Sequence, residues 1–144
     1  MTEEVLKLEN QLCFPLYVAS KEVIRKYRPY LDALDLTYTQ YIAMMVLWEE
    51  KKINVRDLGS KLYLDSGTLT PLLKSMESKG FIKRSRSKDD ERIVLAELTK
   101  KGERLKTKAA DIPAKVAGCL KLGSKEALEL YRLLNKLISE LNEK

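Results

Sequence analysis

The stretch DSGTLTPLLKSMESKG, residues 65–80, predicts a helix with two unlike faces. Asp65 or Ser66 is a suitable N-cap, because its side-chain oxygen can accept a hydrogen bond from a free backbone N–H of the first turn. Gly80 follows at the position where the backbone often becomes left-handed. One face suits a core and the other a partner surface. The apolar face holds Leu69, Leu72, Leu73 and Met76, and the polar face holds Ser66, Thr68, Thr70, Lys74 and Ser75.

Further elements are predicted on both sides of this helix. A helix, a short extended link and a second helix precede it, and two β-prone runs around the polar turn SKDDER follow it as a hairpin. This order is that of a winged helix-turn-helix, with its core at residues 37–104. In chain order the flanking elements are expected at 39–50, 53–55, 56–62, 81–86 and 93–98.

The N-terminal segment carries a helical apolar stripe over residues 8–27. Proline is tolerated in the first turn of a helix, so the main helix is expected to begin near Pro15, with Cys13 just before it. The positive end of the helix dipole would then face the sulfur. The Arg-Pro pair at 28–29 is expected to end this helix, because the residue before a proline disfavours the α conformation.

The C-terminal segment is predicted to form one helix over 99–119 and another whose seam includes Leu130, Leu134 and Leu137. Apolar helices at both ends of a small core suggest a dimerisation layer made of residues 1–36 and 105–144. The alternative is that these helices pack only within the monomer. The fold class is therefore mainly α (α+β), a winged helix-turn-helix with flanking dimerisation helices in a single domain, 1–144.

The charge of the chain is concentrated in the predicted core. Residues 51–104 hold 14 Lys/Arg against 8 Asp/Glu, which accounts for the whole net charge of +6. A cationic patch suits a polyanion, either nucleic acid or a membrane surface, although it can also be a solvated face.

The content of cysteine and histidine limits the chemistry. With two cysteines and no histidine, neither a zinc site nor a disulfide scaffold is expected, and no metal or cofactor is predicted. The start MTEEVLKLEN lacks the apolar region of a signal peptide, and the longest apolar run is too short to span a membrane. The cytoplasm is the expected location, where Cys13 and Cys119 would be reduced at rest.

Four segments together resemble the MarR family, and within it the organic hydroperoxide resistance regulators and their staphylococcal thiol-sensing relatives. They are LENQLCF (8–14), DSGTLTPLLK (65–74), DDER (89–92) and the strand end Leu98-Thr99. The resemblance covers nearly the whole chain. It implies a homodimeric repressor that binds a pseudo-palindromic operator in double-stranded DNA and releases it when an N-terminal cysteine is oxidised.

The resemblance also implies roles for single residues. Cys13 matches the sensing cysteine, and Cys119 lies near the resolving position of two-cysteine members. Pro15 departs from the pattern, because a small residue is expected after Cys-Phe. The tyrosines that stabilise the sulfur from the partner subunit match Tyr27 and Tyr38, with Tyr17 nearby, and the wing residues match Asp90 and Arg92.

The chemistry of the thiol agrees with such roles. A thiolate attacks peroxide oxygen, and no histidine is present to take the proton, so tyrosine O–H groups and a helix N-terminus are the available stabilisers. The alternative for Cys13 is an inert core cysteine. Cys119 is either a resolving thiol or a small apolar filler, because a disulfide requires Cα atoms within roughly 7 Å.

DNA recognition divides into two tasks. Small residues on the 65–80 helix would let it enter the major groove, and Arg92 suits a narrow minor groove. Cationic residues either contact phosphates or are solvated. The groove residues are Ser66, Thr68, Thr70 and Pro71, and the candidate phosphate contacts are Lys74, Lys83, Arg84, Arg86 and Lys88.

The main functional hypothesis is a redox-sensing repressor with organic hydroperoxide or a related oxidant as effector. A second hypothesis keeps the fold but gives control to a small-molecule ligand, with Cys13 incidental. A thiol peroxidase is disfavoured, because the chain has no thioredoxin-like βαβ pattern and no arginine near Cys13. The protein is thus expected not to be an enzyme. The operator, the target genes, the preferred oxidant and any activating role stay open.

Overall fold

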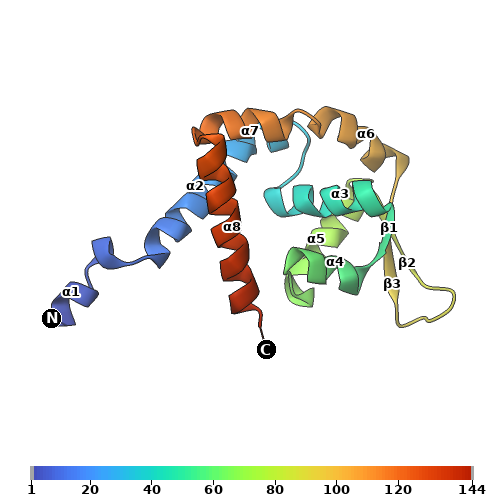
Figure 1. Ribbon diagram of the computed structural model, residues 1–144. Helices are drawn as coiled ribbons and strands as arrows, with labels where there is room; N and C mark the ends of the chain where they lie inside the picture. Colours follow the sequence, from blue (N-terminus) through green and yellow to red (C-terminus); the bar gives the residue numbers. More distant parts are fainter. Residues whose placement is uncertain (1, 144) are drawn as a thin grey trace.

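The computed structural model describes residues 2–143 and consists of helices with one small sheet (Figure 1). The order helix, strand, helix, helix, hairpin runs from α3 to β3, so the predicted winged helix-turn-helix is confirmed. The elements are α1 (Thr2–Val5), η1 (Leu8–Asn10), α2 (Cys13–Asp32), α3 (Tyr38–Glu50), β1 (Lys52–Asn54), α4 (Val55–Leu62), α5 (Ser66–Ser78), β2 (Ile82–Arg86), β3 (Val94–Leu98), α6 (Lys100–Ala109), α7 (Ile112–Leu120) and α8 (Ser124–Leu141).

Side-chain caps fix where the three central helices begin. Thr37 and Gln40 form a capping box at the start of α3. The Asn54 side chain accepts a hydrogen bond from the backbone N–H of Arg56 at 2.8 Å, and Asp65 accepts one from that of Thr68 at 2.7 Å. Asp65, rather than Ser66, is therefore the N-cap of α5.

The wing is part of a three-stranded antiparallel sheet with the order β1-β3-β2. β2 and β3 form the predicted hairpin, with Arg84 opposite Ala96. The extended link expected at 53–55 is the strand β1 (Lys52–Asn54), in which Ile53 pairs with Ala96 of β3, while Val55 already belongs to α4. The strand β1 ties the sheet to the start of α4. Gly80, with φ of 82°, lets the chain turn from α5 into β2, as predicted.

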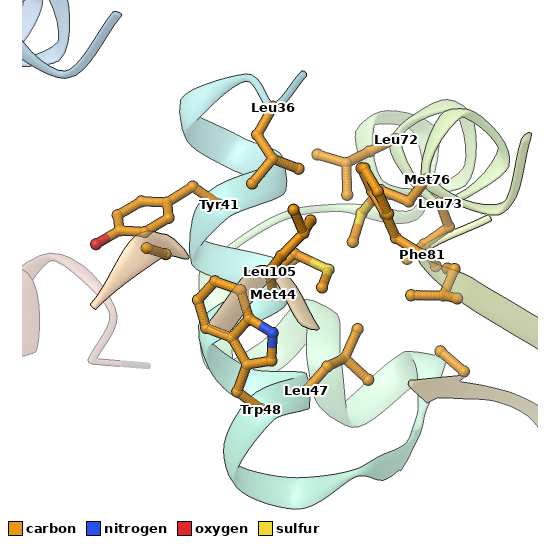
Figure 2. Close-up of a cluster of buried hydrophobic side chains, with 14 of the residues drawn as sticks. Leu36, Tyr41, Met44, Leu47, Trp48, Leu72, Leu73, Met76, Phe81 and Leu105 are labelled. Carbon is orange, nitrogen blue, oxygen red and sulfur yellow. The ribbon is translucent and has the colours of Figure 1, made fainter. Parts of the chain in front are cut away.

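The core is formed where α3, α5 and the sheet meet (Figure 2). Met44 and Leu47 of α3 pack with Leu73 and Met76 of α5, and all four are at most 1% exposed. Burying side chains of this size contributes about 1.5–3 kcal/mol each. The predicted apolar face of α5 is thus confirmed, and its burial turns the opposite face outward.

The helix α2 does not end at Arg28 and Pro29, as expected, but continues to Asp32. Proline removes the N–H that would bond to the carbonyl of Arg25, and Arg25 is exposed, so water can satisfy that carbonyl. Beyond the proline, Leu31 is only 2% exposed. Burial of Leu31 in the core keeps the last turn helical against the local preference.

The single helix expected over 99–119 is two helices, α6 and α7, separated at Ala110 and Asp111. Pro113 has no N–H and cannot continue the hydrogen bonds of α6, but it fits the first turn of α7. The break turns the chain, so that α7 packs against α2. Ile112 and Val116 are each 2% exposed at this contact.

Two helices leave apolar surface uncovered within one chain. No residue of α8 is buried, and the first turns of α2 are also exposed. Contiguous apolar surface of this kind marks a protein interface. No helix within residues 2–143 is both long enough and apolar enough to cross a membrane. The uncovered large side chains include Leu12, Phe14, Leu16, Leu130, Leu133, Leu137 and Leu141.

Candidate functional site

Cys13 is the first residue of α2, a helix of 20 residues, and its side chain is exposed. The helix begins at Cys13 itself and not near Pro15, which lies in the first turn and needs no N–H there. The thiol is therefore at the positive end of a long helix dipole, as expected. It also lies on the uncovered apolar surface, next to Leu12 and Phe14.

Tyr27 and Tyr38 lie together but far from the Cys13 of their own chain. Their ring centroids are 5.0 Å apart, and Tyr41 joins them at 5.7 Å from Tyr27. Fourteen residues separate Cys13 from Tyr27 on α2, which at 1.5 Å per residue is about 21 Å. Burial, and then the neighbouring Tyr38, raise the pKa of Tyr27 above its ordinary value. Its phenol therefore stays protonated and can donate.

Tyr17 lies one turn after Cys13 on the same face of α2. Its ring is 62% exposed, and the Lys21 ammonium lies 5.7 Å from the ring centroid. Of the three tyrosines singled out by sequence, Tyr17 is the one within a turn of the thiol along α2. Cys119 lies in the last turn of α7, and it is free and exposed like Cys13.

The outward side of α5 is the reading face, defined as Ser66, Thr68, Thr70, Pro71 and Lys74. All five residues are exposed, while the apolar side of the helix is buried. The side chains before Lys74 are short, so the backbone of α5 can approach a groove closely.

The cations of the wing have different surroundings. Lys83, Arg86 and Lys88 are exposed, although the Lys83 ammonium lies 4.0 Å from the Glu97 carboxylate and Arg86 donates to the carbonyl oxygen of Glu91 at 2.8 Å. Arg84 is instead paired with Glu77 of α5, with 3.1 Å between Nη2 and Oε1. Its contact with phosphate stays a prediction, but its guanidinium already has a partner in the chain.

Arg92 lies at the tip of the wing and is 90% exposed in its side chain. Its Nε donates to Oδ1 of Asp90 at 3.1 Å, and its Nη2 donates to Oδ2 at the same distance. These hydrogen bonds hold the pKa of the Asp90 carboxyl below its ordinary value. The carboxylate orients the guanidinium without covering it.

Two residues that the sequence did not single out lie near the reading face. Arg56 and Tyr63, both exposed, line a groove of about 1130 Å³ between α4, the start of α5 and the tip of the wing. Ser66 and Arg92 line the same groove. The position of Arg56 in the first turn of a helix, two residues after the cap Asn54, is the signal that could have revealed it. Within residues 2–143, no three Cys, Asp or Glu side chains lie close enough to hold a metal ion.

Comparison with known proteins finds transcriptional regulators. Residues 20–109 match the family model described as transcriptional regulator SarA/Rot. An organic hydroperoxide resistance transcriptional regulator of Bacillus subtilis (strain 168) is 49% identical over 139 residues, covering 96% of this chain and 95% of that protein. The regulator SarZ of Staphylococcus aureus (strain USA300) is 43% identical, covering 92% of this chain and 90% of SarZ.

Among solved structures, AbfR of Staphylococcus epidermidis is similar along its whole length. Its reduced, DNA-bound form matches with a TM-score of 0.79 and 32% identity, covering 99% of this chain and 100% of AbfR. Its disulfide form matches with a TM-score of 0.68, covering 99% and 98%. The resemblance inferred from the sequence is confirmed, and the chain belongs to the MarR family of winged-helix transcriptional regulators, alongside the organic hydroperoxide resistance regulators and SarZ.

Proposed function

We propose that this chain is a redox-sensing repressor that binds operator DNA as a homodimer and releases it when Cys13 is oxidised by an organic hydroperoxide or a related oxidant. The observation that carries the proposal is the place of Cys13, exposed at the N-terminus of α2 within an uncovered apolar surface. A helix N-terminus favours the thiolate, and the apolar surroundings suit the organic part of a hydroperoxide.

The proposed first step is attack of the Cys13 thiolate on the outer oxygen of the hydroperoxide. An S–O bond forms, the O–O bond breaks, and the leaving alkoxide takes a proton to become an alcohol, which leaves a sulfenic acid. If Cys119 is the resolving thiol, its sulfur attacks the Cys13 sulfur, a disulfide forms and water leaves. Each Cys13 consumes one molecule of oxidant and does not turn over, so the chain acts as a regulator and not as an enzyme.

A dimer brings to the Cys13 thiolate the hydrogen-bond donors Tyr27 and Tyr38, which cannot reach it within one chain. Tyr27 lies about 21 Å along α2 from Cys13, and Tyr38 of α3 packs against Tyr27, so both would stabilise the thiolate of a second copy. The exposed faces of α2 and α8 supply the apolar surface for that dimer. In this proposal residues 1–36 and 105–144 form the dimerisation layer around a DNA-binding core at 37–104, within one domain. A repressor that acts on operator DNA in this way would work in the cytoplasm.

The DNA-binding surface combines the reading face with the wing. The reading face enters the major groove, Lys83, Arg86 and Lys88 contact phosphates, and Arg92, held by Asp90, enters the minor groove. Two such surfaces in a dimer match a pseudo-palindromic operator, with half-sites separated by whole turns of DNA.

The test is a DNA-binding titration of the reduced protein, repeated after one equivalent of cumene hydroperoxide and again after dithiothreitol. The proposal expects tight binding, loss of binding and recovery, in that order. Binding that survives oxidation would contradict it. A Cys13→Ser protein that still releases DNA with a small aromatic ligand would favour control by a ligand instead.

A further inference from the structure

Gln40, in the first turn of α3, is only 4% exposed and is the one buried polar side chain recorded among the described residues. Its Nε2 donates to Oγ of Ser75 on α5 at 3.0 Å. Its Oε1 accepts from the backbone N–H of Thr37 at 3.1 Å and from Nζ of Lys79 at 3.0 Å. A buried amide stabilises a structure only when its polar atoms have partners, and both atoms of this amide do.

The direction of the amide is fixed by its neighbours. The Lys79 ammonium and the Thr37 N–H can only donate, so the side chain must present its oxygen to them. The amide nitrogen must then face Ser75. Since the reverse orientation would place two donors against the NH2 group, Gln40 has one acceptable arrangement in this site.

The same network reaches the corner between α2 and α3. Lys79, directly after α5, also donates to the carbonyl oxygen of Asp35 at 2.7 Å, and its ammonium lies 3.6 Å from the Asp35 carboxylate. Asp35 has a φ of 58°, which sets the turn. The C-terminal end of α5 is therefore bonded to the start of α3 and to the α2–α3 corner by directional contacts.

The remaining contacts of α5 with α3 are apolar. Leu72, Leu73 and Met76 are buried there. Apolar packing favours contact but is non-directional, and it tolerates small rotations of a helix about its axis. Hydrogen bonds lose strength steeply with angle and distance. Gln40 and Lys79 thus restrict the rotation of α5, and with it the direction of the reading face.

We propose that Gln40 is a positioning residue, which sets the rotation of α5 so that the reading face meets base edges in the correct register. This inference rests on the proposed function in taking α5 as the recognition helix. Contacts with bases carry sequence information, whereas contacts with phosphates are largely independent of sequence. A rotated α5 would therefore lose specificity and keep most of its non-specific affinity.

The test compares two duplexes of equal length on reduced protein. One is selected from a random library with the wild-type protein, and the other is its scrambled sequence. In Gln40→Met, which keeps the length of the side chain and removes its amide, the ratio of the two affinities should fall about tenfold, the equivalent of one to two lost hydrogen bonds. Gln40→Glu keeps the acceptor, and Ser75 can then donate, so it should retain most of the ratio.

Thr37→Ala is the matched control. It removes a cap from the same helix end without touching α5, so thermal stability should fall while the affinity ratio stays unchanged. If Gln40→Met fails to fold, Ser75→Ala and Lys79→Met test the same bonds from α5, and a reduced ratio is expected in both. An undiminished ratio in the folded variants overturns the positioning role. A wild-type protein with no preference for any duplex would instead overturn the proposed function, and the inference with it.

Discussion

Glu77 on α5 and Arg84 on β2 join α5 to the wing. The Glu77 carboxylate accepts hydrogen bonds from Arg84 Nη2 at 3.1 Å, from its Nε at 3.3 Å and from its backbone N–H at 3.1 Å. These bonds hold the pKa of Glu77 below its ordinary value. The two surfaces proposed to bind DNA are therefore fixed to each other by one ion pair.

Replacing Glu77 with Ala should loosen the wing. The Arg84 backbone N–H would lose its acceptor, so its hydrogen exchange should become faster, and operator affinity should fall. Because folding lowers the pKa of Glu77, the contribution of the pair to stability is present at neutral pH. It is lost as the pH falls below the ordinary carboxyl range. In Glu77→Gln, the free energy of unfolding should no longer include the contribution that is lost at acid pH. Urea unfolding at several pH values measures this. Unchanged exchange at Arg84 would count against the linkage.

Cys13→Ser should bind operator DNA like the wild type and fail to respond to hydroperoxide. The substitution removes the one thiol at the N-terminus of α2 and preserves its size and exposure. Fluorescence anisotropy of labelled operator, before and after oxidant, measures both properties. If the oxidised variant leaves DNA as readily as the wild type, the sensor is another residue.

Arg92→Ala should weaken operator binding by about 1–3 kcal/mol and leave the dimer intact. The guanidinium is exposed at the wing tip, so its loss removes a DNA contact and no core contact. Affinity at several salt concentrations, with gel filtration for the dimer, checks this. Asp90→Asn is the companion variant and should give a smaller loss, because Arg92 keeps its charge but not its bidentate partner. Equal binding by all three proteins would remove the wing from the interface.

Thr99→Ala should destabilise the fold by about 1–2 kcal/mol. The Thr99 hydroxyl accepts from the backbone N–H of Gly102 at 3.0 Å as the N-cap of α6, and it donates to the carbonyl oxygen of Gly80 at 2.6 Å. Urea unfolding at a fixed protein concentration measures the loss, since a dimer's apparent stability depends on concentration. Thr99→Ser keeps the hydroxyl and should recover most of it. Equal losses in both variants would assign the effect to the methyl group.

Cys119 should determine the final product of Cys13 oxidation. If it resolves the Cys13 sulfenic acid between subunits, oxidised wild type runs as a covalent dimer on non-reducing gels, and Cys119→Ser runs as a monomer. The serine variant should still lose DNA, more slowly or less completely, because the sulfenic acid persists or is capped by a small thiol. Wild-type behaviour of Cys119→Ser on gels and in release would leave a one-cysteine mechanism.

Local patterns in the sequence predicted much of this molecule, and the failures have identifiable causes. The faces of α5 and the hairpin follow from short-range periodicity, which is visible in one segment. The prediction that α2 ends at Pro29 is wrong, because burial of Leu31 overrides the conformational preference of the residue before proline. Pro113 itself indicates the break between α6 and α7, but the helical periodicity over 99–119 favoured a single helix.

Contacts between residues far apart in the chain could not be predicted from the sequence. Nothing near Gln40 indicates that its amide would meet Ser75, 35 residues away. The ion pair of Arg84 with Glu77 could not be predicted from the sequence, because Glu77 belongs to a different element. The contact of Tyr38 with Tyr27 depends on how α3 packs against α2, which neither segment shows alone.

Trp48 gives this protein a built-in optical probe. It is the single tryptophan, it is 8% exposed, and its Nε1 donates to the carbonyl oxygen of Gly102 at 2.9 Å, which joins α3 to α6. Its ring meets Tyr41 edge-on at 6.4 Å, and Tyr41 adjoins Tyr27 and Tyr38. Light absorbed by these tyrosines can therefore reach the indole. Its emission would report, without any label, on changes at the tyrosine cluster as oxidant is added.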